Sequence, residues 1–239
     1  MKAKYLLLMA ALALLVMIWC SRRTEQGTVE FTFTGDRIQF AATAESLTVD
    51  WDDGSIAEYH NLDSTAVVHR YASNAERTVR IRKAKKLSAF NCSGDEYRGG
   101  SITALDVSDC PTLTALNCCW NELSALDVSN HTALTSLECG YNQLSVLDVS
   151  KNTALTALSC SHNRLSALDV SKNTVLTALS CYDNELSALD VSKHTALTSL
   201  SCRSNRLSAL DVSNNTALTT LYCSYNQLSA LDVSRNTAL

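Results

Sequence analysis

The chain has 239 residues, of which 46% are hydrophobic and 18% charged, so it is long enough to bury a substantial core in one or two domains. Its net charge is −4, and lysine and arginine do not gather on one segment beyond a short run. This balance lacks the basic footprint of a nucleic-acid-binding protein, so no nucleic-acid partner is expected.

The N-terminal segment has the layout of a secretory signal. Lys2 and Lys4 precede an apolar run from Tyr5 to Trp19. At about 1.5 Å per residue this run covers roughly 22 Å, which is less than the roughly 30 Å hydrocarbon core of a bilayer. Cleavage or shallow anchoring is therefore favoured over a stable transmembrane span.

The apolar run is followed by Cys20, and this arrangement resembles a bacterial lipoprotein signal, in which that Cys is lipidated and becomes the mature N-terminus. Trp19 stands where such signals have a small residue, so an uncleaved signal anchor and ordinary secretion stay open as alternatives. Arg22 and Arg23 occupy a place where lipoproteins displayed on the cell surface often have acidic residues. The sequence predicts a signal peptide at 1–20 and an exported protein anchored to the membrane of the bacterial cell envelope, with surface display less well supported.

After a linker at 21–28, residues 29–86 have the pattern of a small antiparallel β module. Short alternating or β-branched runs are separated by turn residues, and they read VEFTFTG, RIQFAA, LTVDWDD, AVVHRY and RTVRIR. Residues 50–54 (DWDDG) and 69–71 (HRY) resemble the marks of the PKD-type β-sandwich, although Asp52 replaces an expected Gly. A PKD-like module is expected, with Trp51 buried against the opposing sheet.

The DWDDG segment also raises a question about metal binding. Gly tolerates positive φ and Asp bonds its own backbone, so residues 52–54 most simply form a tight hairpin turn. Calcium held by Asp50, Asp52 and Asp53 is the alternative.

From residue 87 onward the chain is repetitive, and LDVS recurs every 21 residues, at Leu105, Leu126, Leu147, Leu168, Leu189, Leu210 and Leu231. The unit core, L-x-x-L-x-C-x-x-N-x-L, resembles the leucine-rich-repeat consensus. Six regular units fill 113–238 and begin at Leu113, Leu134, Leu155, Leu176, Leu197 and Leu218. A degenerate first unit covers 87–112, and its extra residues within 96–101 should protrude as a loop. Leu239 begins another unit without a polar cap, so we expect either a longer chain, in which the repeats are a spacer for a further domain, or capping by a partner.

Alternation within each unit predicts one short strand. In the second unit Leu137 and Cys139 point inward, while Ser136, Glu138 and Gly140 point outward. Seven strands stacked in parallel about 4.8 Å apart give a sheet roughly 30 Å long. Only 21 residues per turn leave no room for a long helix on the other side. The predicted fold is mainly β: a leucine-rich-repeat solenoid (87–239) with an irregular or 3₁₀ convex side, preceded by a small β-sandwich-like module.

Three columns of the repeat have structural interpretations. The resemblance implies a buried ladder formed by Asn121, Asn142, Asn163, Asn184, Asn205 and Asn226. An inward ladder of packing thiols is expected from Cys92, Cys118, Cys139, Cys160, Cys181, Cys202 and Cys223, because parallel Cβ vectors misfit a disulfide and a line of thiols does not converge on a metal. The Asp of each LDVS is expected to cap a turn, with calcium along the column as the alternative.

Variation between units points to the function. The outward strand positions and the turn just beyond them change in size, charge and aromaticity while the core letters barely change, as in a recognition surface. The predicted binding surface consists of Trp120, Glu138, Tyr141, His162, Tyr182, Arg203, Tyr222 and Tyr225. The function expected is non-enzymatic binding or adhesion to a protein or glycan, including one of a host, and neutral drift at solvent positions is the alternative.

A catalytic function has one candidate constellation. His162 and Asp183 lie on successive units with Ser161 or Ser204 near, which is the residue set of a hydrolase triad. An open strand face supplies no pocket that excludes water. We therefore expect no enzyme, no catalytic residue, no cofactor and no metal.

Overall fold

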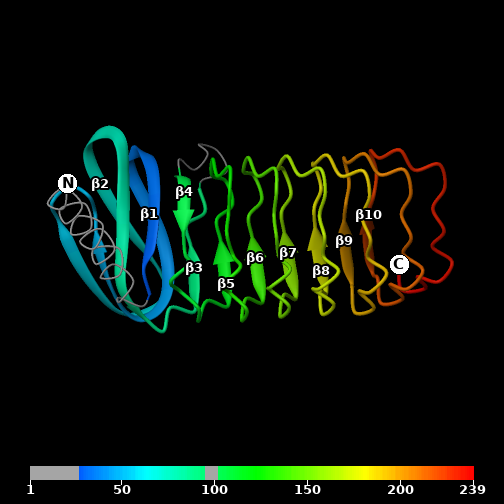
Figure 1. Cartoon of the computed structure of the whole chain (residues 1–239), viewed down its shortest axis with the longest axis horizontal. Coiled ribbons are helices and arrows are strands. Elements are labelled where there is room, and N and C mark those ends of the chain that lie inside the picture. Colours follow the sequence, from blue (N-terminus) through cyan, green and yellow to red (C-terminus); the bar gives the residue numbers. More distant parts are fainter. Residues whose placement is uncertain (1–26, 95–101) are drawn as a thin grey trace, which may run out of the picture.

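The computed structural model describes residues 27–94 and 102–239. The predicted signal peptide at 1–20, the lipidation site Cys20 and the expected loop at 96–101 lie outside the described residues. The described residues form an elongated molecule, with an antiparallel module at one end and coils stacked along the long axis (Figure 1). Within these ranges no helix is long and apolar enough to cross a membrane.

Two long strands, β1 (Val29–Asp50) and β2 (Ile56–Lys85), build the module as a bent antiparallel hairpin. Register shifts after Gly35, Ala42 and Ser46 divide β1 into four stretches. The last stretch, 46–50, pairs with both 56–60 and 80–85, so the hairpin folds back on itself. Burial alternates along β1, as expected for a sheet with one face in a core. The antiparallel β pattern predicted from the alternating runs is confirmed, whereas a sandwich of the PKD type stays a prediction.

The module is joined to the first coil by strand pairing on two sides. β3 (Ala89–Asn91) pairs antiparallel with residues 41–43 of β1 and parallel with β5 (Ala115–Asn117). β4 (Ile102–Asp106) pairs antiparallel with residues 30–33 of β1. The sequence did not predict β4 as a strand, because its residues read as the return part of a degenerate repeat. The pairing covers the first coil, and a domain boundary at residue 86 stays a prediction.

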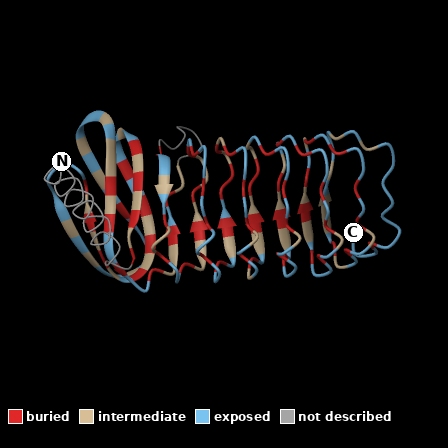
Figure 2. Ribbon diagram, in the orientation of Figure 1, coloured by how far each residue is buried: buried red, intermediate tan, exposed pale blue. Residues whose placement is uncertain are grey.

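The core is continuous across this junction. Phe90 of the first coil lies 5.6 Å from Phe40 and 6.3 Å from Phe31 between ring centroids, and all three side chains are buried. One cluster of buried residues includes both the module and the coils, and Figure 2 shows buried residues in both parts. Such a core holds the module and the solenoid in one arrangement.

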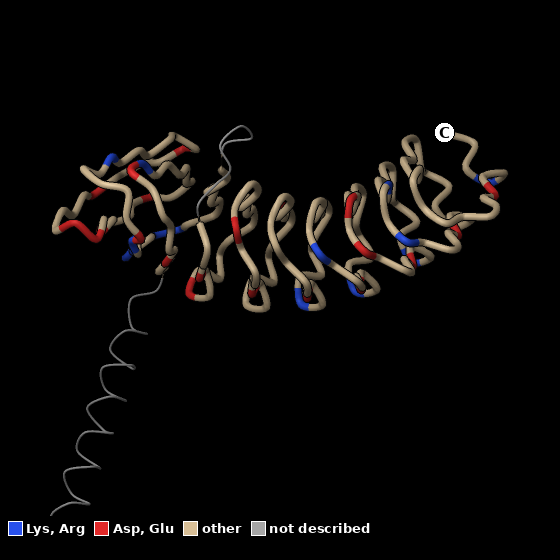
Figure 3. Tube along the Cα trace, turned by 90° about the horizontal axis from the view of Figure 1, so that it is seen from above, with Lys and Arg blue, Asp and Glu red and all other residues tan. Residues whose placement is uncertain are grey.

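The regular coils each contribute one three-residue strand: β5, β6 (Ser136–Glu138), β7 (Ala157–Ser159), β8 (Ala178–Ser180), β9 (Ser199–Ser201) and β10 (Thr220–Tyr222). These strands pair in parallel at a register of 21 residues. On the opposite side the backbone forms consecutive turns, in which Asn152 N–H donates to Val149 O and Leu155 N–H donates to Asn152 O. The leucine-rich-repeat solenoid is thereby confirmed, and its convex side takes the irregular form. Figure 3 shows the coils following a gentle arc, with acidic and basic residues interspersed.

The predicted Asn ladder is present, and each amide joins two coils. Asn142 Nδ2 donates to the carbonyl oxygens of Cys118 (2.9 Å) and Cys139 (3.1 Å), and its Oδ1 accepts from Leu123 N–H at 3.0 Å. The same three bonds recur at Asn163, Asn184, Asn205 and Asn226. Backbone groups that the turn leaves unpaired are satisfied in this way.

The cysteine ladder faces inward beside these amides. Cys118, Cys139, Cys160 and Cys181 are buried free thiols, and Cys223 in the last full coil is partly exposed. Burial raises the pKa of the Cys160 thiol to about 12 and that of Cys139 well above its usual range. The thiols therefore stay protonated and pack as small apolar groups.

A second buried polar ladder was missed by the sequence analysis, and it consists of His131, Asn152, Asn173, His194, Asn215 and Asn236. Asn173 Nδ2 donates to Val149 O at 3.0 Å and to Asn152 O at 2.9 Å, whereas His194 Nε2 has the single partner Val170 O at 3.1 Å. The signal was available in the 21-residue recurrence of Asn or His before Thr.

The Asp of each LDVS caps a turn, as predicted. Asp148 Oδ1 accepts the N–H of Ser150 at 2.8 Å, and the equivalent bond occurs at every LDVS. Hydrogen bonds from the backbone and hydroxyl of Ser150 lower the pKa of Asp148. The carboxylates are therefore engaged locally, and the described residues contain no cluster of three or more His, Cys, Asp or Glu side chains suited to a metal ion.

Candidate binding surface

The turn after each strand places one side chain in the same unusual backbone conformation. These residues form the turn column, defined as Trp120, Tyr141, His162, Asp183, Ser204 and Tyr225, and their φ angles lie between 51° and 59°. Left-handed backbone at a non-glycine residue costs on the order of 1 kcal/mol. Backbone bonds to the next coil hold it, as from Tyr141 N–H to Ser161 O at 2.8 Å. Every coil thus aims one variable side chain from a fixed backbone position.

Four of the predicted contact residues come together on the first regular coils. The rings of Trp120 and Tyr141 are stacked with centroids 3.5 Å apart, and Tyr141 is stacked on His162 at 4.0 Å. Tyr182 meets His162 edge-on at 4.8 Å and places its hydroxyl 3.0 Å from that of Tyr141. These residues, Trp120, Tyr141, His162 and Tyr182, are called the aromatic cluster below. All four are partly exposed.

Small residues give Tyr182 room to reach back across two coils. Cys119, Gly140, Ser161 and Tyr182 occupy equivalent positions in successive coils. A Cβ at Gly140 would lie 3.1 Å from Ser161 O, and Ser161 itself is buried with its hydroxyl 2.8 Å from that of Ser180. The sequence contained this signal as a bulky residue following a glycine and a serine in one column.

His162 is paired with a carboxylate on the next coil. Its Nδ1 lies 2.5 Å from Asp183 Oδ2, and the two side chains are 31% and 53% exposed. Burial lowers the pKa of His162, and the nearby Asp183 carboxylate only partly opposes this effect. The ring is therefore neutral at pH 7, and the short contact to Asp183 assigns the proton to Nδ1. Nε2 is then left as a hydrogen-bond acceptor at the edge of the cluster.

Among the described residues, the remaining predicted contacts make no ring contact with the aromatic cluster. The Arg203 guanidinium lies 4.9 Å from the centroid of the Tyr225 ring, and Tyr222 on β10 is 59% exposed. Glu138 on β6 accepts a hydrogen bond from Asn117 Nδ2 at 2.9 Å and lines a 250 Å³ hollow at the junction with the module. Arg203 follows Tyr182 in the same column of the repeat, one coil further along, so the predicted surface continues along the strand face beyond the aromatic cluster.

The proposed hydrolase constellation is only partly assembled. His162 and Asp183 are in contact, but the Ser161 hydroxyl is directed to Ser180. Ser204 lies one coil beyond Asp183 in the turn column. In the part of the chain that the structure describes, the paired His and Asp lack the serine that a triad requires.

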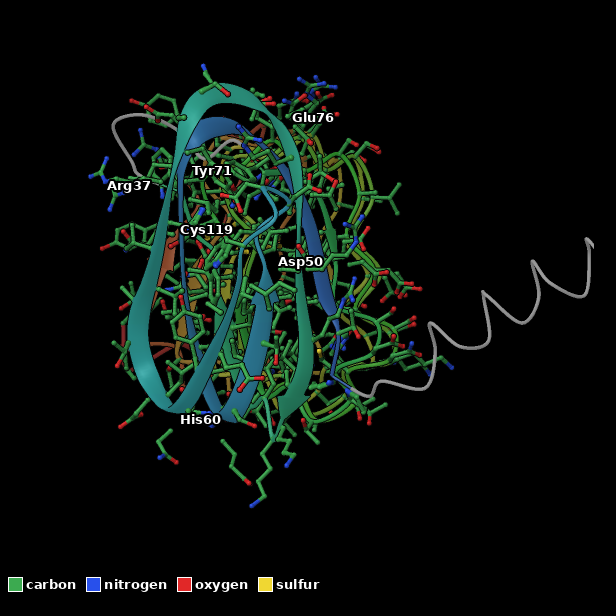
Figure 4. All side chains as sticks on the ribbon, turned by 90° about the vertical axis from the view of Figure 1, so that its left-hand side faces the viewer. Arg37, Asp50, His60, Tyr71, Glu76 and Cys119 are labelled. Atoms are coloured by element: carbon green, nitrogen blue, oxygen red, sulfur yellow. The ribbon has the colours of Figure 1, made fainter. Side chains whose placement is uncertain are left out.

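The two sequence motifs of the module, residues 50–54 and 69–71, are in contact. The rings of Trp51 and His69 are stacked 4.5 Å apart, His69 Nε2 lies 2.8 Å from Asp53 Oδ2, and the Tyr71 hydroxyl donates to Trp51 O at 2.9 Å. Trp51 is buried, as predicted. Figure 4 shows Tyr71 inside the module, with Arg37 and Glu76 extending from its rim.

The carboxylates of the DWDDG segment already have protein partners. Asp50 accepts from Asp52 N–H at 3.2 Å and pairs with Arg82 at 3.6 Å, and Asp52 accepts from Thr78 N–H at 3.0 Å. Hydrogen bonds from Ser55 and His69 lower the pKa of Asp53 to about 2. The segment is thus a hydrogen-bonded turn in this structure, and a calcium ion would have to displace these contacts.

Comparisons with known proteins agree with the solenoid. No protein-family model and no curated protein sequence matches the chain. Among solved structures, the functional domain of InlJ from Listeria monocytogenes, described as including a cysteine ladder, is 44% identical and covers 62% of this chain at a TM-score of 0.59. An internalin from the same organism, inlF, is 25% identical over 55% of this chain at 0.49, and YopM, a leucine-rich effector of Yersinia pestis, is 22% identical over 49% at 0.41.

The match also covers only part of those structures. This chain spans 32% of the InlJ domain, 40% of the inlF structure and 39% of YopM. The structural neighbours are therefore internalin-type and other leucine-rich-repeat proteins, of which a limited stretch is shared.

Proposed function

We propose that this chain is a non-enzymatic binding module of a cell-envelope protein, and that it binds a protein or glycan ligand through the outward strand face and turn column of its solenoid. The observation that carries the proposal is the aromatic cluster, in which Trp120, Tyr141, His162 and Tyr182 are assembled on the surface without serving the core. Similarity to the functional domain of InlJ and to an internalin supports an adhesion-type role on a bacterial envelope protein.

Preassembly is what makes the cluster suited to binding. Immobilising a flexible side chain on association costs about 0.5–1.5 kcal/mol, and aromatic residues are the side chains that most often dominate binding energy. Stacking, the Tyr141–Tyr182 hydrogen bond and the fixed left-handed backbone already restrain these rings. A ligand with a flat apolar face and a donor for His162 Nε2 matches what the cluster presents.

Attachment to a membrane is the second part of the proposal. The charged start, the apolar run to Trp19 and the following Cys20 support export and lipid anchoring. Anchoring would hold the module end near the bilayer and leave the coils to extend outward with their strand face exposed.

The test uses the full chain as a probe on arrays of extracellular proteins and of glycans. Tyr141→Ala combined with Tyr182→Ala should weaken binding to the positive spots by at least about tenfold, since loss of a central aromatic contact commonly removes more than about 1.4 kcal/mol. Val146→Ala with Val175→Ala is the matched control, because these exposed side chains lie on other turns of the coils. Full retention of binding by the tyrosine pair would contradict the proposed surface.

A further inference from the structure

The basic face of the module lies where the chain leaves the membrane-attachment segment. Gly27, the first described residue, donates its N–H to Asp109 O at 2.9 Å and accepts from Ala84 N–H at 3.0 Å. Four exposed cations, Arg82, Lys83, Lys85 and Lys86, surround this anchor point within five residues of sequence. Figure 3 shows a group of basic residues at the lower edge of the module.

A cavity of about 490 Å³ opens at the same place. Its lining combines the three lysines with Leu87, Cys110 and Pro111, and it also includes the acidic residues Glu45 and Asp109. Lys86 is paired with Glu45 at 3.0 Å and Arg82 with Asp50, whereas Lys83 and Lys85 have no ion pair among the described residues. The cavity therefore has a mixed apolar and acidic lining, together with two ammonium groups, those of Lys83 and Lys85, that form no ion pair among the described residues.

The backbone conformation at two of the lysines is a second observation that points to a function of this face. Lys83 and Lys86 both have left-handed φ angles, 53° and 51°, at positions where glycine or asparagine would be less strained. Strained backbone of this kind is concentrated at functional sites. Here it directs two lysines from a buried strand end toward solvent.

The length of the preceding chain limits how far this face can lie from a membrane. The seven residues from Cys20 to Gly27 reach at most about 25 Å at roughly 3.3–3.6 Å per residue. Attachment at Cys20 or through residues 5–19 therefore keeps the lysines close to the headgroup layer. Anionic lipids attract each such cation by about 1 kcal/mol within a Debye length of about 8 Å.

We propose that the surface formed by Arg82, Lys83, Lys85, Lys86 and the adjoining cavity docks onto the anionic phospholipid headgroups of the membrane that anchors the chain. The inference rests on the membrane attachment in the proposed function and adds to it a defined membrane-facing side. Docking would fix the orientation of the solenoid on the bilayer, which a flexible linker alone would leave free.

The test measures lysine reactivity in the full chain on vesicles. The chain is reconstituted on vesicles of phosphatidylcholine alone or of phosphatidylcholine mixed with phosphatidylglycerol, and it is treated with a water-soluble amine-acylating reagent. Labelling of Lys83 and Lys85 is measured by peptide mass spectrometry relative to Lys151, Lys172 and Lys193, which are exposed on the coils and serve as internal controls. Labelling at the basic face should slow by about fivefold or more on the anionic vesicles only, and 1 M salt should abolish the difference.

A charge variant separates docking from simple crowding. Lys83→Gln with Lys85→Gln should remove the protection of Lys86 on anionic vesicles, whereas Lys151→Gln with Lys172→Gln should preserve it. Equal labelling on both vesicle types, or equal protection on both, overturns the proposal while leaving attachment intact. A chain that fails to float with either vesicle overturns membrane attachment and this proposal together, and array binding through the aromatic cluster is tested separately.

Discussion

The hydroxyl oxygens of Tyr141 and Tyr182 lie 3.0 Å apart although 41 positions separate the two residues in sequence, so one hydrogen bond spans two coils. Burial, together with this bond, raises the pKa of Tyr182 to about 12. Trp120 and His162 are both stacked on the Tyr141 ring, and the hydrogen bond to Tyr182 restrains that ring further.

Removing only the Tyr141 hydroxyl should loosen this bond without removing the ring. In Tyr141→Phe we expect the pKa of Tyr182 to fall, because the hydrogen bond to Tyr141 is one of the causes that raise it. Stability should drop by about 1 kcal/mol, the usual net value of one hydrogen bond. Spectrophotometric titration and urea unfolding measure both effects, with Tyr222→Phe as the exposed control. An unchanged Tyr182 titration would show that the bond does not form in solution.

The double variant Tyr141→Ala with Tyr182→Ala should lower thermal stability as well as binding, because it removes two members of the stacked cluster. Stacked aromatic pairs contribute about 0.5–1.5 kcal/mol beyond burial, so a measurable loss is expected in thermal unfolding. Binding assays on this variant must therefore be run well below its unfolding temperature, and the two tyrosine-to-phenylalanine variants separate ring loss from hydroxyl loss.

The His162–Asp183 pair predicts a pH dependence. Since the pKa of His162 is lowered in the folded chain, the unfolded chain binds more protons, and stability should decline as pH falls through about 6.5, the ordinary value for histidine. Asp183→Asn should lower the pKa of His162 further, because the carboxylate raises it. NMR titration of the imidazole tests this, with Asp211→Asn as a control in a distant turn. A rise in the pKa would contradict the assigned balance between burial and charge.

The second buried ladder predicts a stabilising substitution. His194 makes one hydrogen bond where asparagines at equivalent positions make two, so His194→Asn should add a bond to Asn173 O and raise the free energy of unfolding by about 1 kcal/mol. Chemical unfolding measures the change, and His60→Asn on the exposed module surface should have little effect. A loss of stability would mean that the larger ring packs better than the amide bonds.

The cysteine ladder predicts an order of reactivity. Burial raises the pKa of Cys160 to about 12 and that of Cys139 well above its usual range, so at about pH 8 neither thiol should be alkylated before the solenoid opens. Cys223 is partly exposed and should react first. Timed alkylation followed by mass spectrometry gives the order, and denaturant should bring all rates together. Early modification of Cys139 would contradict the inward ladder.

Asp53 predicts an acid transition in the module. Its folded pKa of about 2 lies below the ordinary value of 3.8, so its contribution to stability is complete above about pH 4 and is lost as pH falls toward 2. Asp53→Asn should therefore lower stability at neutral pH and converge with the unmodified chain near pH 2. Chemical unfolding at a series of pH values tests this, with Asp63→Asn as the exposed control.

Much of the solenoid was predictable because its core repeats in sequence. One inward Leu, one Cys and one Asn per 21 residues suffice to define a strand, a ladder and a turn, and their positions were predicted residue by residue. The pairing of β4 with β1 was not predictable, because Ile102 and Leu105 fit the repeat as well as they fit a strand. The module supplies the strand that pairs with residues 102–106, and no local sequence pattern encodes this long-range pairing.

The candidate binding surface was likewise predictable only in part. Variation between coils identified Trp120, Tyr141, His162 and Tyr182 as outward residues, but the stack itself depends on rotamers and on the space left by Gly140. The cluster therefore depends on packing between coils, which the sequence pattern alone does not encode.

Each ladder Asn bonds only to its own coil and to the one before it. Excision or duplication of a complete 21-residue unit would therefore bring equivalent partners together, and the same hydrogen bonds would form between the newly adjacent coils. Unequal recombination in the repeated gene segment could shorten or lengthen the molecule in steps of about 4.8 Å. Loss of the unit that carries His162 would also place Asp183 beside Tyr141, so a change in length and a change in specificity would arise together.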